Sequence, residues 1–144
     1  MSSGTDLSAV LIQIAKDALW APPAVFATHY WVTEWLEHEP YVDPVMHFAG
    51  GAAIALCFWH FLLGWERFKG RIVIENKVLL AFWLTVLIAV AWEAMEYGIL
   101  IYSNWPAGWN LLNTLRDLVL GAGGAALVLS WLRRRKPAEI LNYP

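Results

Sequence analysis

The sequence has little charge and almost no cysteine, and both shortages exclude classes of protein. Asp, Glu, Lys and Arg together make up 15% of the 144 residues, whereas apolar residues make up 59%. A soluble domain of this length seldom carries so few charges. The single cysteine, Cys57, excludes an internal disulfide. The basic residues flank hydrophobic segments instead of forming a patch of their own, so we predict no nucleic-acid partner.

Three hydrophobic segments are long enough to cross a bilayer, which takes about 20 mostly apolar residues. They run from Asp43 to Trp65, from Val78 to Tyr102 and from Leu111 to Leu132. We therefore predict an all-α fold, a multi-pass membrane helix bundle of three transmembrane helices within residues 43–132. Its first partner is the lipid bilayer.

Basic residues predict the orientation of these segments. Arg67, Lys69, Arg71 and Lys77 lie in or beside the first connection, and the tail 133–144 begins with three arginines and a lysine. The connection between the second and third segments, 103–110, carries no charge. Because Lys and Arg concentrate on the cytoplasmic side of membranes, we expect an inner (plasma) membrane protein with a cytoplasmic basic tail.

The N-terminal residues 1–42 allow more than one interpretation. Apolar residues recur at helical spacing before Pro22 and Pro23, and a second piece, Ala24 to His38, mixes aromatic with acidic residues. Such a mixture is typical of the headgroup level of a membrane. We interpret both pieces as interfacial amphipathic helices on the outer side. A fourth span across Leu7 to Trp31, or docking onto a partner protein, are the alternatives.

Five ionisable side chains lie at membrane depth, where charge is costly and marks a functional site. At the rise of a helix, His47 lies about 6 Å below Asp43 at the outer end of the first span. Glu96 and Glu93 lie about 9 and 13 Å below the outer end of the second span. Asp117 lies about 9 Å below that of the third. Three helices therefore carry carboxylates and an imidazole to one layer.

The spacing of small residues predicts that these helices pack closely. Gly121 and Gly124 follow Asp117 along one stripe of the third span. Small residues allow helix backbones to approach one another in lipid, which would bring the carboxylates within ligand distance. Arg116 lies at the right depth to neutralise one or two of them.

Carboxylates gathered in a low-dielectric pocket need compensation by protons, by Arg116 or by a metal cation. Several carboxylates with one imidazole are ligands suited to a divalent Fe, Mn, Zn or Mg ion. We therefore hypothesise a metal site whose ligands come from Asp43, His47, Glu93, Glu96 and Asp117. A structural or substrate-binding polar network, and a proton or ion path, are the alternatives.

Three further histidines stand outside this set. His29 and His38 precede the first span and would become extra ligands if the N-terminal helices folded over the site. His60 lies deeper and towards the cytoplasmic half. His60 has two interpretations: a structural one, as a hydrogen-bonded core histidine, and a functional one, as a pigment or haem ligand.

Three short segments carry a resemblance to a known family. They are Asp43-Pro-Val-Met-His47-Phe48, Trp92-Glu93-Ala-Met-Glu96-Tyr97, and Asn113-Thr-Leu-Arg-Asp117 followed by Gly121 and Gly124. In order and depth they resemble the signature segments of VanZ-like membrane proteins, and more closely those of the YjdF-like bacterial group. The resemblance implies a bacterial membrane protein with a site at these residues, and it implies no established reaction.

Two functions of different classes follow from these observations. The first is a metal-dependent membrane enzyme that acts on a lipid-like substrate, with no catalytic residue yet assigned among the five. The second is a non-enzymatic accessory subunit of a larger membrane complex, in which the cluster is structural. Three spans are few to enclose a catalytic cavity, so both hypotheses predict a homo-oligomer or other membrane subunits as partners.

Overall fold

The computed structural model describes residues 7–35, 42–69, 76–103 and 110–134, and almost all of these residues are helical. The helices are α1 (Leu7–Ile14), a π-helical turn η1 (Ala15–Leu19), α2 (Ala21–Trp35), α3 (Val42–Lys69), α4 (Lys77–Ser103) and α5 (Leu111–Arg134). The predicted all-α class is confirmed. Over the described ranges, four stretches have the length and hydropathy of a membrane span.

Asparagine side chains fix where two of the long helices begin. The amide N–H of Leu79 donates to Oδ1 of Asn76 at 3.2 Å, and the amide N–H of Leu112 donates to Oδ1 of Asn110 at 2.9 Å. An oxygen in this position satisfies one of the backbone donors that the first turn of a helix leaves unpaired. These caps account for the starts of α4 and α5, which lie within a residue of the starts predicted from hydropathy.

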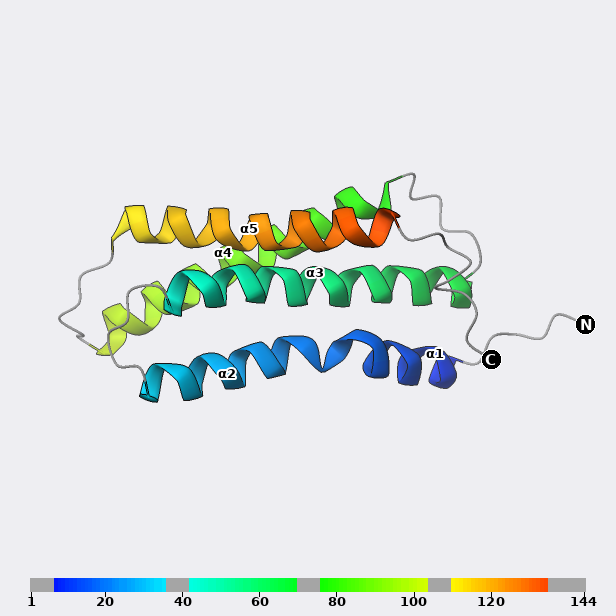
Figure 1. The fold of residues 1–144 in the computed structure, drawn as a ribbon, viewed down its shortest axis with the longest axis horizontal. Coiled ribbons are helices and arrows are strands. Elements are labelled where there is room, and N and C mark those ends of the chain that lie inside the picture. The colour runs from blue at the N-terminus through cyan, green and yellow to red at the C-terminus, as the bar shows by residue number, and fades with distance from the viewer. Residues whose placement is uncertain (1–6, 36–41, 70–75, 104–109, 135–144) are drawn as a thin grey trace, which may run out of the picture.

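The N-terminal residues form one helical rod that runs antiparallel to α3 (Figure 1). Its stretch Leu7–Val32 has the length and composition of a span. Gly64, late in α3, lies against Val10 and Ile14 of α1. The arrangement of the rod along α3 therefore favours the fourth-span alternative over two separate interfacial helices.

The π-helical turn lies where the prolines disturb the rod. Pro22 has no backbone N–H, so it cannot donate to the carbonyl of Ala18 one helical turn earlier. The Ala18 carbonyl oxygen accepts from the Trp20 N–H and from the Cys57 thiol of α3, the latter at 2.9 Å. Ala18 is fully buried, so the two helices are in close contact at this point. The Ala18 carbonyl, four residues before Pro22, thus links the rod to α3.

Helix α3 occupies the centre of the bundle, and each of the other long helices packs against it (Figure 1). Helices α4 and α5 also pack on one another, whereas no Cα atom described in α2 comes within 8 Å of one in α4. The ends of α2 and α4 and the starts of α3 and α5 lie together, and we call this the site end. The opposite end, with Lys69, Lys77, Arg133 and Arg134, is the basic end.

Glycines bring α3 and α5 into backbone contact, as the small-residue pattern predicts. A Cβ atom added to Gly51 would collide with the carbonyl oxygen of Gly121. One added to Gly124 would collide with the carbonyl oxygen of Phe48. Only residues without a side chain allow this approach. It determines how close the polar side chains of the two helices come at the site end.

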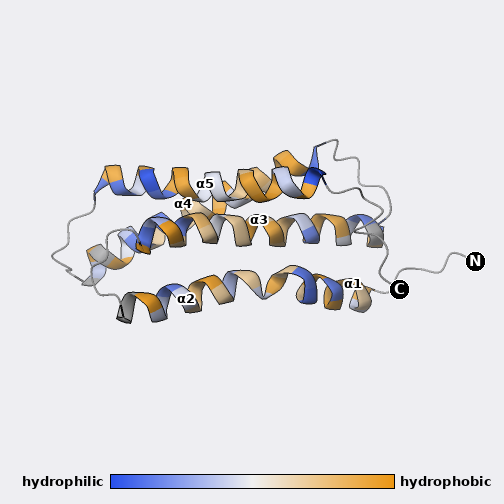
Figure 2. Ribbon diagram, in the orientation of Figure 1, coloured by the Kyte–Doolittle hydropathy of each residue, from blue (hydrophilic) through white to orange (hydrophobic). Residues whose placement is uncertain are grey.

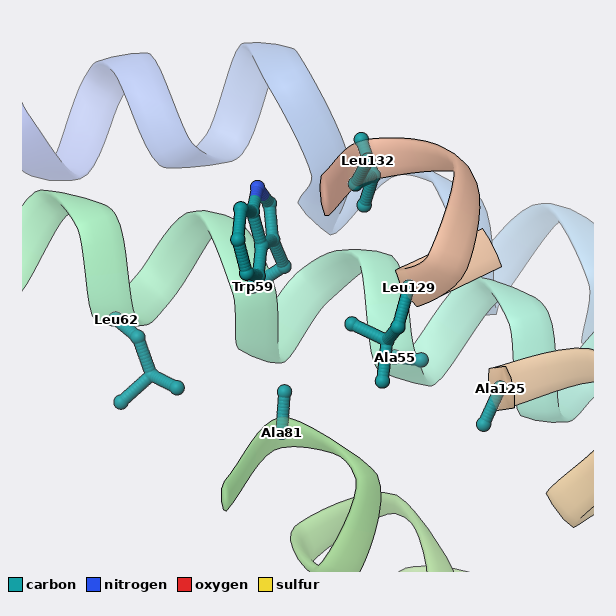
Figure 3. Close-up of a cluster of buried hydrophobic side chains, with 7 residues drawn as sticks. All are labelled: Ala55, Trp59, Leu62, Ala81, Ala125, Leu129 and Leu132. Atoms are coloured by element: carbon teal, nitrogen blue, oxygen red, sulfur yellow. The ribbon is translucent and has the colours of Figure 1, made fainter. Parts of the chain in front are cut away.

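The apolar core fills the half of the bundle towards the basic end. Figure 3 shows its side chains, which come from α3, α4 and α5 and are Ala55, Trp59, Leu62, Ala81, Ala125, Leu129 and Leu132. Large apolar residues also cover the outer faces of the helices, for example Val119, Leu127 and Trp83. A surface so apolar is suited to lipid. Figure 2 shows hydrophilic residues interrupting it near the start of α5 and within α1 and η1.

Candidate metal centre

The five ionisable side chains predicted to converge all lie at the site end. The first turns of α3 carry Asp43 and His47, the last turns of α4 carry Glu93 and Glu96, and Asp117 lies in the second turn of α5. Asp117 is the most enclosed of the acids, with 8% of its side chain exposed. The close packing of α3 on α5 brings His47 towards it.

Three of these residues, Asp43, His47 and Asp117, offer ligand atoms that lie close to one another. His47 Nε2 lies 3.3 Å from Asp43 Oδ1 and 3.9 Å from Asp117 Oδ2. One ligand atom from each of the three residues falls within 4.8 Å of the other two. Small movements of these side chains would bring the three atoms around one cation with bonds of about 2.0–2.2 Å. The set combines two carboxylates and one imidazole, in keeping with the predicted chemistry.

Arg116 holds the two aspartates from the side away from His47. Its Nη2 donates to Asp43 Oδ2 at 2.8 Å, and its Nε donates to Asp117 Oδ1 at 2.9 Å. Each carboxylate therefore uses one oxygen on the guanidinium and turns the other oxygen to the imidazole. The planar fork of arginine fixes both acids in orientation at once. Its predicted role as the neutralising partner corresponds to these contacts.

The two glutamates occupy different places from the aspartates. Glu93 Oε1 lies 3.8 Å from His47 Nδ1, on the opposite side of the ring from Asp43 and Asp117. A carboxylate behind a metal-binding imidazole orients the ring and fixes its tautomer. Glu96 lines the neighbouring cavity. The geometry thus divides the predicted set into three converging residues, one carboxylate behind the histidine and one beside the cavity.

The remaining histidines fall in three different settings. His29 of α2 lines the cavity together with His47. His38 lies outside the described residues, so the prediction that it adds a ligand stays a prediction. His60 Nδ1 lies 3.5 Å from Asp17 Oδ2 of the N-terminal rod, in the half away from the site. The contact gives His60 a polar partner on the rod, and both interpretations of this histidine stay predictions.

Asp17 belongs to a second polar group that the sequence reasoning missed. Gln13 Nε2 donates to Asp17 Oδ1 at 2.8 Å, and Asp17 faces His60 across the interface between η1 and α3. A signal was present, since Asp17 and Gln13 lie four residues apart inside a stretch that has the hydropathy of a span. An interfacial helix would expose Asp17 to water, where it needs no partner, whereas a spanning rod encloses it in the bundle.

A cavity of about 490 Å³ adjoins the converging residues. Its lining comes from α2, α3, α4 and α5 and is mostly apolar. The polar members of that lining are His29, His47, Thr85, Glu93, Glu96 and Asp117. Thr85 lies at the deep end, where its hydroxyl donates to the Ala81 carbonyl of its own helix at 2.8 Å. The other polar side chains are gathered at the site end, so the cavity has one polar end and an apolar remainder.

A bundle of four long apolar helices with ionisable groups inside it defines a multi-pass membrane protein. The chain belongs to the DUF2238 family of predicted membrane proteins, whose sequence model matches residues 18–137. No curated protein and no solved structure matches the chain. The family description names no reaction, and the resemblance to VanZ-like and YjdF-like proteins stays an expectation.

Proposed function

We propose that this membrane protein binds one divalent cation between Asp43, His47 and Asp117. The observation that carries the proposal is the convergence of Asp43 Oδ1, His47 Nε2 and Asp117 Oδ2 while Arg116 holds the other oxygen of each aspartate. Side chains fixed in this way lose little freedom on binding an ion, which favours affinity. Fe, Mn, Zn and Mg remain the metals that suit the ligand set.

The charges around the site support a cation in addition to Arg116. Asp43, Glu93 and Asp117 bring three formal negative charges, and Arg116 returns one positive charge. A divalent ion would neutralise the rest when His47 is neutral, the form in which imidazole binds metals. Among the five predicted residues, Glu96 is then the one carboxylate whose charge this sum leaves out. Because uncompensated charge is costly at membrane depth, the ion would stabilise the bundle.

The chemistry best suited to such a site is metal-assisted hydrolysis of an ester or phosphate in an amphipathic substrate. Three protein ligands leave a coordination position for water, as in catalytic zinc sites. A bound cation acidifies that water and polarises the bond under attack. Glu96 is the carboxylate we assign to proton transfer, because it lines the cavity and, unlike Glu93, is not the carboxylate behind His47. The apolar remainder of the cavity would receive the hydrophobic part of the substrate.

One observation favours the second function, an accessory subunit with a structural cluster. Arg116 already bonds to both Asp43 and Asp117 and offsets one of their charges, so with a proton on a second acid the network can stabilise helix contacts with no ion present. In that case the exposed apolar faces of the bundle would contact other membrane subunits or further copies of this chain. Under both functions we propose the inner membrane, with the basic end in the cytoplasm.

Elemental analysis of the detergent-purified protein separates the two functions. We expect about one equivalent of a divalent metal in the wild type and its loss in His47→Ala and Asp117→Asn, which each remove a ligand. His60→Gln is the matched control, because it removes a histidine from the other half of the bundle and should retain the metal. A folded wild type that stays metal-free after incubation with all four metals would favour the structural subunit.

A further inference from the structure

The cavity lies beside a gap between two helices. Helices α2 and α4 both line it, yet within the described ranges their backbones do not approach each other. One aromatic pair spans the gap: the rings of Phe26 and Trp92 meet edge to face, with centroids 6.0 Å apart and planes at 78°. Phe26 is 57% exposed and Ile88 is 42% exposed, so the rim of the gap faces the surroundings of the bundle. In a membrane those surroundings are lipid chains.

The shape and polarity of the cavity identify what would fill it. Along α4 the lining runs from Glu96 to Thr85, which is about 16 Å at the rise of a helix. The carboxylates and imidazoles of the lining gather towards the site end. Apolar residues such as Ile54 and Ile88 line the part of the cavity nearer the basic end. Its volume falls within the range of about 300–1,000 Å³ typical of small-molecule sites. A long space with one polar end and an apolar remainder suits a molecule that has a polar head and a single hydrophobic chain inside.

Gly50 keeps part of this space open. It lines the cavity, and a Cβ atom built there would meet nothing within 4 Å. The glycines that bring α3 onto α5 behave differently, because a Cβ on Gly51 or Gly124 would collide with backbone. Helix packing therefore does not require a glycine at this position, but a large side chain there would occupy part of the cavity.

We propose that one acyl chain of a membrane phospholipid enters this cavity sideways from the bilayer, between α2 and α4 and past the Phe26–Trp92 pair. The chain lies along Ile54 and Ile88, and the phosphate-bearing head lies at His47 and Glu96. Placing the head at the metal rests on the proposed function. The position of the chain rests only on the cavity and the gap.

Photo-crosslinking tests the proposal in nanodiscs made with phosphatidylglycerol that carries a diazirine midway along one acyl chain. We expect crosslinks on the α3 and α4 peptides that contain Ile54 and Ile88. Gly50→Phe should reduce them by about tenfold, since its side chain takes the place of the acyl chain. Gly98→Phe is the matched control, because a Cβ at Gly98 of α4 also meets nothing and Gly98 is absent from the cavity lining. It should label like the wild type.

Two further variants keep the test decisive. Gly50→Leu fills less of the cavity and should give an intermediate reduction, which covers the case of a Gly50→Phe protein that does not fold. Trp92→Ala widens the gap and should increase labelling at Ile54. Labelling that is equal in the wild type, Gly50→Phe and Gly50→Leu, or that falls only on outward residues such as Val119, would overturn the proposal.

Metal analysis of the same samples separates the inference from the proposed function. Labelling that depends on Gly50 in a protein that binds no metal would support the acyl-chain site and refute the metal site. A protein that binds one metal but whose labelling does not depend on Gly50 would support the metal site and refute the acyl-chain site. In the wild type with metal, the chelator EDTA should leave mid-chain labelling in place, because the cavity away from the site end offers mostly apolar contacts and the Thr85 hydroxyl there donates to its own helix.

Discussion

His47 on α3 and Asp117 on α5 lie with Nε2 and Oδ2 3.9 Å apart because glycines let the two helices touch. Two backbone contacts, Gly124 with Phe48 and Gly51 with Gly121, lie next to this pair on its side towards the basic end. A larger residue at either contact would separate the helices, and the ligand atoms would separate with them. The geometry of the site therefore depends on residues that carry no polar group.

The substitution Gly124→Ala should destabilise the protein by about 1–3 kcal/mol, the usual cost of overpacking. Its Cβ would collide with the Phe48 carbonyl, which belongs to a helix backbone and cannot rotate away. Gly123→Ala is the neighbouring control. A Cβ there would lie 3.7 Å from the Phe48 ring, an ordinary contact, so we expect no loss of stability. Denaturation of both variants in detergent measures the difference, and equal midpoints would contradict the account of helix packing.

The substitution Arg116→Gln should lower the stability of the metal-free protein by about 1 kcal/mol, because two aspartates lose their cationic partner and the guanidinium is only partly buried. Added divalent cation should restore part of that loss by neutralising Asp43 and Asp117. Thermal unfolding with and without the metal measures both effects.

The ion pair at the basic end provides the control for Arg116. Lys77 Nζ lies 2.6 Å from Glu66 Oε2, and Lys77→Gln should cost a similar amount. The metal should give this variant no more stabilisation than it gives the wild type, because Glu66 stands far from the converging ligands. A metal-induced gain that is no larger in Arg116→Gln than in Lys77→Gln would count against a cation between the two aspartates.

The contact between Asp17 and His60 should appear as an energetic coupling between the N-terminal rod and α3. We expect a double-mutant cycle with Asp17→Asn and His60→Leu to give an interaction of about 0.5–3 kcal/mol, the range for residues in one polar network. Neither single variant should alter the metal content. Strictly additive losses of stability would mean that the contact at 3.5 Å contributes nothing to holding the rod.

The termini should lie on the same side of the membrane, because the rod and three further helices make an even number of crossings. With the basic end in the cytoplasm, alkaline phosphatase should be inactive when fused before Leu7 or after Arg134 and active when fused after Ser103. If the fusion before Leu7 is active together with the one after Ser103, the interpretation of the N-terminal helices as interfacial is restored.

Hydropathy and helix caps are local properties, so the sequence was enough to predict the long helices. The predicted starts at Asp43, Val78 and Leu111 lie within one residue of the observed starts of α3, α4 and α5. Depth along a helix also follows from residue counting, and for that reason the layer of acids and imidazole could be predicted. The close approach of α3 and α5 followed from the glycine stripe.

The sequence could not supply the rotation of one helix against another. Whether Glu93 faces Nε2 or Nδ1 of His47 depends on ring orientation, which no spacing encodes. The pairing of Asp17 with His60 depends on the register of the rod along α3, in which the Cys57 thiol also meets the Ala18 carbonyl. The cavity also required α2 to lie beside α3, which the interfacial interpretation did not include.

Electron paramagnetic resonance of added Mn²⁺ tests the central claim most directly. One equivalent of Mn²⁺ should give a protein-bound spectrum with hyperfine coupling to a single imidazole nitrogen. That coupling should disappear in His47→Ala and persist in His60→Gln. A spectrum of free aqueous Mn²⁺, or bound Mn²⁺ whose nitrogen coupling survives in His47→Ala, would contradict a cation held by Asp43, His47 and Asp117.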